Sequence, residues 1–250
     1  MEAAHLAAWI IARLVRRKPQ AVLGLATGTT PLATYAELVR MQQRGEVDLR
    51  RIITFNLDEF VGLDENHRCS FHRYMKTHLF DPIGLPRRQI HIPPALASDV
   101  PAACHAYEMS IAAAGGIDLQ LLGIGRDGHI GFNEPTSSLA SRTRIKTLAA
   151  STVMAQQAVF GDDPVPRHVI TMGIGTIRDA RHCVLVATGT HKADAVARTV
   201  EGPVSAMVPA SALQHHPQTT IIVDGEAAAK LTLQDYYRSV FANKPDWQKN

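Results

Sequence analysis

The sequence predicts a single doubly wound, Rossmann-like α/β domain with a mostly parallel central sheet and helices on both faces. Short β-rich runs alternate with segments of helical spacing along the whole chain. Several runs are almost continuously apolar, as in Val22–Leu25 and Leu119–Leu122, which indicates strands buried on both faces of a parallel sheet. The expected strands are residues 21–26, 51–57, 89–92, 117–124, 168–172, 182–188 and 219–224.

A surface helix is predicted over residues 1–17, before the first strand. Leu6, Ile10 and Leu14 recur at helical spacing and form its apolar face. Glu2 opens the helix and arginines close it, the reverse of the charge order in a secretory signal; an organellar transit peptide is the alternative. No apolar run reaches the ~18 residues that a membrane span needs, so neither a membrane segment nor a membrane partner is expected.

The length of 250 residues fits one large globular domain, with two domains as the alternative. No Pro/Gly/Ser-rich linker divides the chain, so we expect a single domain over residues 1–250. The least regular stretch, at about 135–166, follows a glycine-rich loop and is expected to form a mobile lid.

The charge balance indicates the kind of ligand, and the cysteine content indicates the cellular compartment. Lys and Arg number 26 against 23 Asp and Glu, a net charge of +3, without a basic block long enough for a nucleic-acid-binding arm. This balance suits a small anionic ligand. The three cysteines include no CxxC pair, which argues against a disulfide framework or a structural zinc site and favours a cytoplasmic protein.

Four loops that follow predicted strands are the candidates for chemistry, because ligands of open α/β sheets bind beyond the carboxyl ends of the strands. The first loop covers residues 26–31 and precedes a helix expected to run to about Arg44. Thr30 is expected as the N-cap of that helix and Pro31 as its first residue, which leaves backbone N–H groups free for a phosphate. A helix start that binds no ligand is the alternative.

Charged side chains characterise the second and fourth loops. Asp58 and Glu59 follow an apolar strand, where partial burial would raise a carboxyl pKa toward the range of a general base. Two solvated turn residues are the alternative. In the loop over residues 188–192, Lys192 would add a point charge to an anion site, or would be a solvated lysine at a helix start.

The third loop, residues 123–135, contains four glycines that allow tight turns and close approach of a ligand. Asp127, His129 and Glu134 supply an imidazole with two possible carboxylate partners, an arrangement that moves protons near neutral pH. A structural histidine is the alternative. The remaining histidines match no metal-binding spacing such as HExxH, so no metal site is expected.

Together these loops resemble the glucosamine-6-phosphate deaminase family, within the superfamily of aminosugar-phosphate isomerases and 6-phosphogluconolactonases. The resemblance covers nearly the whole chain and is most specific in GIGRDGHIGFNEP, residues 123–135. Further matching stretches are LGLATGTTP (23–31), FNLDEFVGL (55–63), SSLASRTRIKTL (137–148), TMGIGTI (171–177), GTHKADAV (189–196) and PASALQHHP (209–217).

The resemblance implies an enzyme that converts glucosamine 6-phosphate and water to fructose 6-phosphate and ammonia, without a metal or organic cofactor. Asp58 would be the general base that moves a proton between C2 and C1. His129 would open the pyranose ring, with Asp127 and Glu134 as its carboxylate partners. The residues that would hold the substrate phosphate are Thr27, Gly28, Thr29, Thr30 and Lys192.

The resemblance also implies oligomerisation and regulation. The family commonly forms trimers or hexamers, so a homo-oligomer is expected. Ser137, Ser138, Arg144 and Lys146 match the positions that bind N-acetylglucosamine 6-phosphate in allosteric members; the alternative is that the two cations simply face solvent. The chain starts at its first helix, without the short strand usual in the family, so weak coupling of this site to activity is expected.

One departure from the family pattern concerns the substrate phosphate. Family members carry an arginine for the phosphate in the lid, whereas residues 152–158 of this chain contain no arginine. Gly28-Thr29 also stands where Gly-Gly or Gly-Ser is common. The alternatives left open are a galactosamine-6-phosphate deaminase, a 6-phosphogluconolactonase and a non-catalytic phosphosugar-sensing domain.

Overall fold

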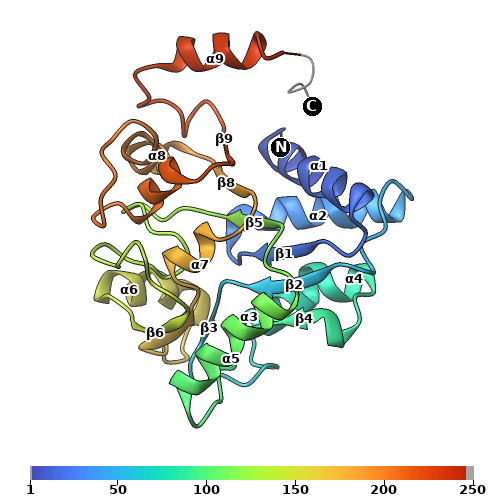
Figure 1. Cartoon of the computed structure of the whole chain (residues 1–250). Helices are drawn as coiled ribbons and strands as arrows, with labels where there is room; N and C mark the ends of the chain where they lie inside the picture. Colours follow the sequence, from blue (N-terminus) through green and yellow to red (C-terminus); the bar gives the residue numbers. More distant parts are fainter. Residues whose placement is uncertain (1, 246–250) are drawn as a thin grey trace.

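Six parallel strands form the central sheet of the computed structural model, which describes residues 2–245 (Figure 1). Their order is β4 (Ile90–His91), β2 (Ile53–Asn56), β1 (Val22–Leu25), β5 (Leu119–Leu122), β8 (Cys183–Ala187) and β9 (Thr219–Val223). The chain moves outward from β1 through β2 to β4 and then returns to the other side of β1 at β5. This reversal makes the switch point at which doubly wound sheets bind their ligands, so the predicted fold class is confirmed.

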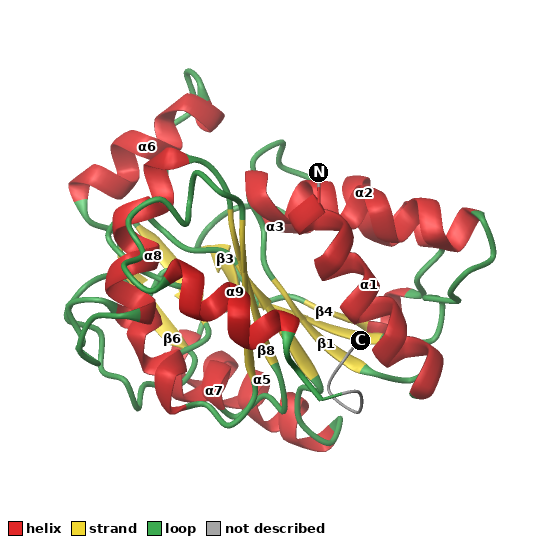
Figure 2. Cartoon of the chain, turned by 90° about the horizontal axis from the view of Figure 1, so that it is seen from above, coloured by secondary structure: helices red, strands yellow, loops and turns green. Residues whose placement is uncertain are grey.

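Helices cover both faces of the sheet, which Figure 2 shows between two helical layers. One layer contains α1 (Glu2–Arg17), α2 (Thr29–Gln43) and a run made of α3 (Phe71–Met75), the π-helix η1 (Lys76–Phe80) and α4 (Asp81–Ile83). The other contains α5 (Val100–Ala113), α7 (Ile174–Arg178), α8 (Ala193–Val200) and the 3₁₀ helix η4 (Pro209–His215). The chain also contains the short 3₁₀ turns η2 (Arg87–Gln89) and η3 (Thr190–Lys192) and a late helix, α9 (Gln234–Ala242).

Side chains alternate across the strands to supply the two cores. Leu23 and Leu25 of β1 pack against the layer of α1 and α2, whereas Val22 packs into the core of the opposite layer. Because both faces are buried, the nearly unbroken apolar runs seen in the sequence are what these strands require.

The first helix packs through a different stripe from the one predicted. Ile11 and Val15 are fully or almost fully buried, whereas Leu6, Ile10 and Leu14 are only partly buried at the edge of the same core. Three alanines of α1 are also buried, and their small side chains allow the close approach to α2 that sets this rotation.

A second, antiparallel sheet was not expected. It consists of β3 (Asp58–Phe60), β7 (His168–Thr171) and β6 (Arg144–Thr147), in the order β3-β7-β6. Residues 168–172 were expected with the parallel strands; they do form a strand, but in this smaller sheet, because an apolar run carries no information on its partner. Leu57 links the two sheets, since its N–H donates to the Leu25 carbonyl and its carbonyl accepts from the Met172 N–H.

The stretch at 135–166 is more regular than predicted. It contains β6 and an eleven-residue helix, α6 (Ala150–Phe160). Leu148 and Phe160 pack with Phe60 and Val169 in a third apolar cluster under the small sheet. This tertiary packing gives order to a segment whose own residues show little periodicity.

Two further observations concern membrane-spanning helices and the cysteines. Among residues 2–245, no helix is long and apolar enough to cross a membrane. Cys69, Cys104 and Cys183 are all buried free thiols, in agreement with the absence of a disulfide framework.

Candidate active site

Three of the four candidate loops follow the adjacent parallel strands β1, β5 and β8, and the fourth follows β2 on the other side of β1. All four therefore meet at the carboxyl edge of the sheet, around the switch point between β1 and β5. The sequence predicts the chemistry at this same edge.

The helix after β1 begins earlier than predicted. Its N-cap is Gly28 and its first residue is Thr29, in place of Thr30 and Pro31. Gly28 has a φ of 108°, a conformation that favours glycine, and this turn lets the helix start two residues sooner. No side chain caps this helix start, so the first N–H groups of α2 have no side-chain acceptor.

The carbonyl groups of the same loop are already engaged. The hydroxyl of Tyr35 donates to the Ala26 carbonyl at 2.5 Å, and the hydroxyl of Tyr74 donates to the Gly28 carbonyl at 2.6 Å. Donors of the loop are thus left available while two of its acceptors are occupied. Such a loop suits an anion.

Asp58 is a buried carboxylate, with 4% of its surface exposed, at the first position of β3. Burial and, secondarily, the charge of Glu59 raise its pKa from 3.8 to about 8. Gly131 of the third loop lies beside it: a Cβ at that position would sit 3.5 Å from Asp58 Oδ2 and 2.9 Å from Thr171 Oγ1. The loop thus approaches the carboxylate closely at a glycine, and because Asp58 is buried, the alternative of a solvated turn residue is wrong for it.

Glu59, unlike Asp58, is held by hydrogen bonds to the backbone. Its carboxylate accepts from the N–H groups of Phe60, Phe71 and His72, and its Oε2 lies 3.3 Å from His72 Nδ1. These bonds tie β3 to the start of α3. Glu59 is therefore buried and fully engaged, and it affects Asp58 through its charge.

His129 is paired with Asp127 within the loop over residues 123–135. Asp127 Oδ1 lies 2.6 Å from His129 Nδ1 and accepts from the His129 backbone N–H at 3.1 Å. Partial burial favours protonated Asp127, but the contacts with His129 outweigh it and hold the pKa of this carboxyl below its usual value. A Cβ at Gly125 would come within 2.2 Å of the His129 ring, so the ring position depends on that glycine.

Glu134 does not join this pair. Its carboxylate accepts from the Ala149 N–H at 3.1 and 3.2 Å and from the Thr152 hydroxyl, both at the start of α6. Within residues 2–245 no hydrogen bond or ion pair connects Glu134 to His129. The expectation of two carboxylate partners for the imidazole is met only for Asp127, because Glu134 caps the helix of the predicted lid.

Lys192, in the loop after β8, contacts the third loop. Its Nζ donates to the Ile124 carbonyl at 2.6 Å, and burial, followed by the charge of Arg126, lowers its pKa while Asp127 opposes the shift. The alternative of a solvated lysine is wrong. Arg126, exposed and close enough to Lys192 to affect its titration, is a cation that the sequence analysis did not single out.

The residues of the expected effector site occupy β6 and the turn before it. Arg144 and Lys146 share the less exposed face of β6, and Ile145 and Thr147 the more exposed one. Ser138 Oγ accepts from the Ala140 N–H, and the buried Ser137 hydroxyl has no partner among the described residues.

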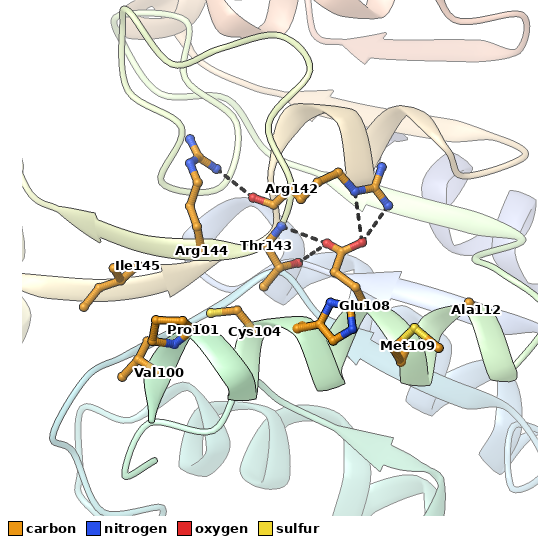
Figure 3. Close-up of a pocket in the computed structure, with 11 residues that line it drawn as sticks. Val100, Pro101, Cys104, Glu108, Met109, Ala112, Arg142, Thr143, Arg144 and Ile145 are labelled. Carbon is orange, nitrogen blue, oxygen red and sulfur yellow. Dashed lines mark hydrogen bonds and ion pairs between the residues drawn. The ribbon is translucent and has the colours of Figure 1, made fainter. Parts of the chain in front are cut away.

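Arg144 also lines a pocket of about 600 Å³ between α5 and β6, away from the four loops (Figure 3). Its Nη1 donates to the Arg142 carbonyl at 3.2 Å, and burial lowers its pKa. The floor of this pocket is held by Glu108, whose Oε1 accepts from the Thr143 N–H and hydroxyl while its Oε2 accepts from Arg142. A second pocket, of about 620 Å³, lies between α1 and β9.

Comparison with known proteins shows what this fold and loop arrangement resemble. A family model described as glucosamine-6-phosphate isomerases/6-phosphogluconolactonase matches residues 1–222. The glucosamine-6-phosphate deaminase of Streptomyces avermitilis is 55% identical over 246 residues, covering 98% of this chain and 94% of the relative. That of Arthrobacter sp. is 53% identical over 244 residues, covering 97% and 94%.

Solved structures agree. A structure described as a monomeric glucosamine-6-phosphate deaminase superposes with a TM-score of 0.89 at 43% identity, covering 92% of this chain and 95% of the other. This neighbour gives no support to the homo-oligomer that the sequence analysis expected. The 6-phosphogluconolactonase from Trypanosoma cruzi, at 20% identity and a TM-score of 0.75, shares the fold over 92% of this chain and 93% of its own. The chain belongs to the glucosamine-6-phosphate isomerase/6-phosphogluconolactonase family.

Proposed function

We propose that this chain is a glucosamine-6-phosphate deaminase, which converts glucosamine 6-phosphate and water to fructose 6-phosphate and ammonia. The observation that carries the proposal is the buried carboxylate of Asp58, with its raised pKa of about 8, at the switch point beside an anion-suited loop. The deaminases more than 50% identical to this chain over nearly its full length support the same reaction.

The phosphate group anchors the substrate at the loop after β1. Thr27, Gly28, Thr29 and Thr30 offer N–H and hydroxyl donors at the start of α2, whose dipole favours an anion. Lys192 adds a positive charge from the loop after β8. Burial lowers the pKa of Lys192, and a phosphate bound beside it would favour the charged ammonium.

Ring opening is assigned to His129. The imidazole accepts the proton of the C1 hydroxyl and returns a proton to the ring oxygen, which breaks the C1–O5 bond and leaves an aldehyde at C1. Asp127, ionised and with Oδ1 2.6 Å from His129 Nδ1, orients the ring. Glu134 contributes through the start of α6, which it caps.

Isomerisation and loss of ammonia follow. The Asp58 carboxylate removes the proton from C2 to give an enolamine and delivers it to C1, which gives a ketimine at C2. Water adds to the ketimine carbon, and ammonia leaves as the C2 ketone forms. The neighbour described as a monomeric deaminase supports a reaction completed within one chain, and the proposed steps call on no metal or organic cofactor.

Galactosamine 6-phosphate is the second candidate substrate; it carries the same phosphate, and α6 offers no cation in residues 150–160 to either amino sugar phosphate. Ammonia release from the two amino sugar phosphates, with hydrolysis of 6-phosphogluconolactone measured alongside, decides among the activities. The proposal predicts that glucosamine 6-phosphate has the highest kcat/KM. It fails if lactone hydrolysis dominates, or if no substrate turns over and the chain only binds phosphosugars.

In this proposal the enzyme is a single domain over residues 1–250, and residues 135–166 form a lid over the site. The reaction takes place in the cytoplasm, where free thiols persist, in agreement with the buried free cysteines. Ser137, Ser138, Arg144 and Lys146 are proposed as a second site for a phosphorylated sugar. Its support is the half-buried guanidinium of Arg144 at the rim of the α5–β6 pocket.

A further inference from the structure

The loop that follows β1 is held by a residue far away in the sequence. Tyr74 lies in α3 and reaches across to Gly28, 46 residues earlier, where its hydroxyl donates to the carbonyl oxygen at 2.6 Å. Gly28 is the N-cap of α2 and has a φ of 108°. Because glycine has wide conformational freedom, the residue type alone does not fix the direction of the Gly28 carbonyl.

The direction of the Gly28 carbonyl matters because of the peptide it belongs to. Its partner across that peptide bond is the N–H of Thr29, the first residue of α2. Carbonyl and N–H of a trans peptide point in opposite directions. Holding the carbonyl on Tyr74 therefore directs the Thr29 N–H away from the Tyr74 hydroxyl and prevents the oxygen from turning toward an anion.

The position of Tyr74 is itself well determined. Its ring packs at the edge of the core beneath α2 and makes an edge contact with the His78 ring, with 4.8 Å between centroids. The π-helix η1 begins two residues after Tyr74, and its wider turn changes the direction of the side chains that follow, so that Leu79 and Phe80 enter the core. Burial raises the pKa of Tyr74 far above its usual value, so the hydroxyl remains a donor.

The geometry points to Tyr74 as a positioning residue of the phosphate loop: its hydroxyl fixes the Gly28 carbonyl so that the N–H groups at the start of α2 face the substrate phosphate. This inference rests on the proposed function for the identity of the anion. Tyr35, from the same core layer, restrains the neighbouring Ala26 carbonyl, so two carbonyls of the loop are engaged while Thr27 and the α2 start keep their donors. Tyr74 touches no reacting atom, and its effect is confined to phosphate binding.

The test is Tyr74→Phe, which keeps the ring against His78 and removes only the hydroxyl. Loss of one hydrogen bond corresponds to about a two- to tenfold effect, so KM should rise by that factor with kcat within about twofold of wild type. Inorganic phosphate, titrated by calorimetry into the intact protein, should bind more weakly by the same factor. Tyr236→Phe, which removes an exposed hydroxyl on α9, should change neither quantity.

The outcomes distinguish a failure of the positioning role of Tyr74 from a failure of the proposed deaminase function. Unchanged phosphate binding and KM in Tyr74→Phe overturn the positioning role. A fall in kcat with KM unchanged also overturns it, since the tyrosine would then act on the chemistry or on the fold as a whole. Wild-type protein that binds inorganic phosphate but releases no ammonia counts against the proposed function alone, because the calorimetric comparison of the two proteins does not need turnover.

Discussion

Asp58 and Glu59 are adjacent in the sequence and both buried, yet their surroundings are opposite. Glu59 accepts hydrogen bonds from three backbone N–H groups, whereas the Asp58 carboxylate has no hydrogen-bond donor among residues 2–245. A buried carboxylate without donors favours its protonated form. The same pair of residues thus provides one structural anchor and one buried carboxyl with a raised pKa, and the charge of Glu59 adds to the effect of burial on Asp58.

The pH profile should show this environment. The pKa of Asp58 is about 8. At a pH below this value the carboxyl is protonated and cannot accept the proton from C2, whereas at a higher pH the carboxylate can accept it. We therefore expect kcat/KM for glucosamine 6-phosphate to rise with pH through an apparent pKa near 8, measured at constant ionic strength. A profile that is flat from pH 6 to 9 would contradict the assignment of Asp58 as the group that titrates.

His129→Gln tests the ring-opening step. Glutamine cannot exchange protons, so turnover of the cyclic substrate should fall by about 10²–10⁴-fold, the usual effect of a lost acid–base group. An open-chain analogue that cannot form the pyranose ring should lose much less. Steady-state rates with the two substrates measure the difference, and equal losses would assign His129 a general structural role.

Ala158→Arg tests the effect of the arginine-free helix α6. A guanidinium paired with the phosphate makes a strong charge-assisted hydrogen bond, so KM should fall severalfold with little change in kcat. Gln156→Arg is the matched control, because two residues along the helix correspond to about 200° of rotation and place the same charge on the opposite side. An unchanged KM in Ala158→Arg would mean that another cation, such as Arg126 beside Lys192 or Arg167, already fills this place.

The proposed second site is tested by two titrations with N-acetylglucosamine 6-phosphate. Calorimetry should detect binding to wild type that Arg144→Gln weakens, since the variant removes the guanidinium at the pocket rim. Substrate saturation curves with and without the effector should nearly coincide, because a ligand with equal affinity for two states shifts neither. Absence of binding would refute the site, and strong activation would refute the weak coupling.

The strands of the fold could be predicted from the sequence because their signals lie in short stretches of the chain. All seven expected strands are present, since apolar runs and the helices between them are properties of short windows. Neither β3 nor β6 was predicted. Both depend on pairing with β7, which lies up to 113 residues from β3 in the register Asp58 to Thr171. The alternation in Arg144-Ile145-Lys146 is strand-like, but it is too short to predict a strand by itself.

The site was predictable to a similar degree. The positions of Asp58, His129 and Lys192 at one edge follow from the rule that parallel strands present their carboxyl ends together. The contact of Glu134 with α6 was not foreseeable, because the spacing from His129 to Glu134 allows either partner. Tyr74 was missed because nothing near it in the sequence marks a hydroxyl that reaches Gly28 across the fold.

The central claim is that Asp58 performs the proton transfer of a glucosamine-6-phosphate deaminase, and the most direct measurement compares wild type with Asp58→Asn. Asparagine keeps the shape of the side chain and removes its basicity. Wild type should release ammonia and fructose 6-phosphate in equal amounts from glucosamine 6-phosphate, and the variant, folded and still binding inorganic phosphate, should be slower by about 10²–10⁴-fold. Ammonia release by Asp58→Asn at near the wild-type rate would contradict the account.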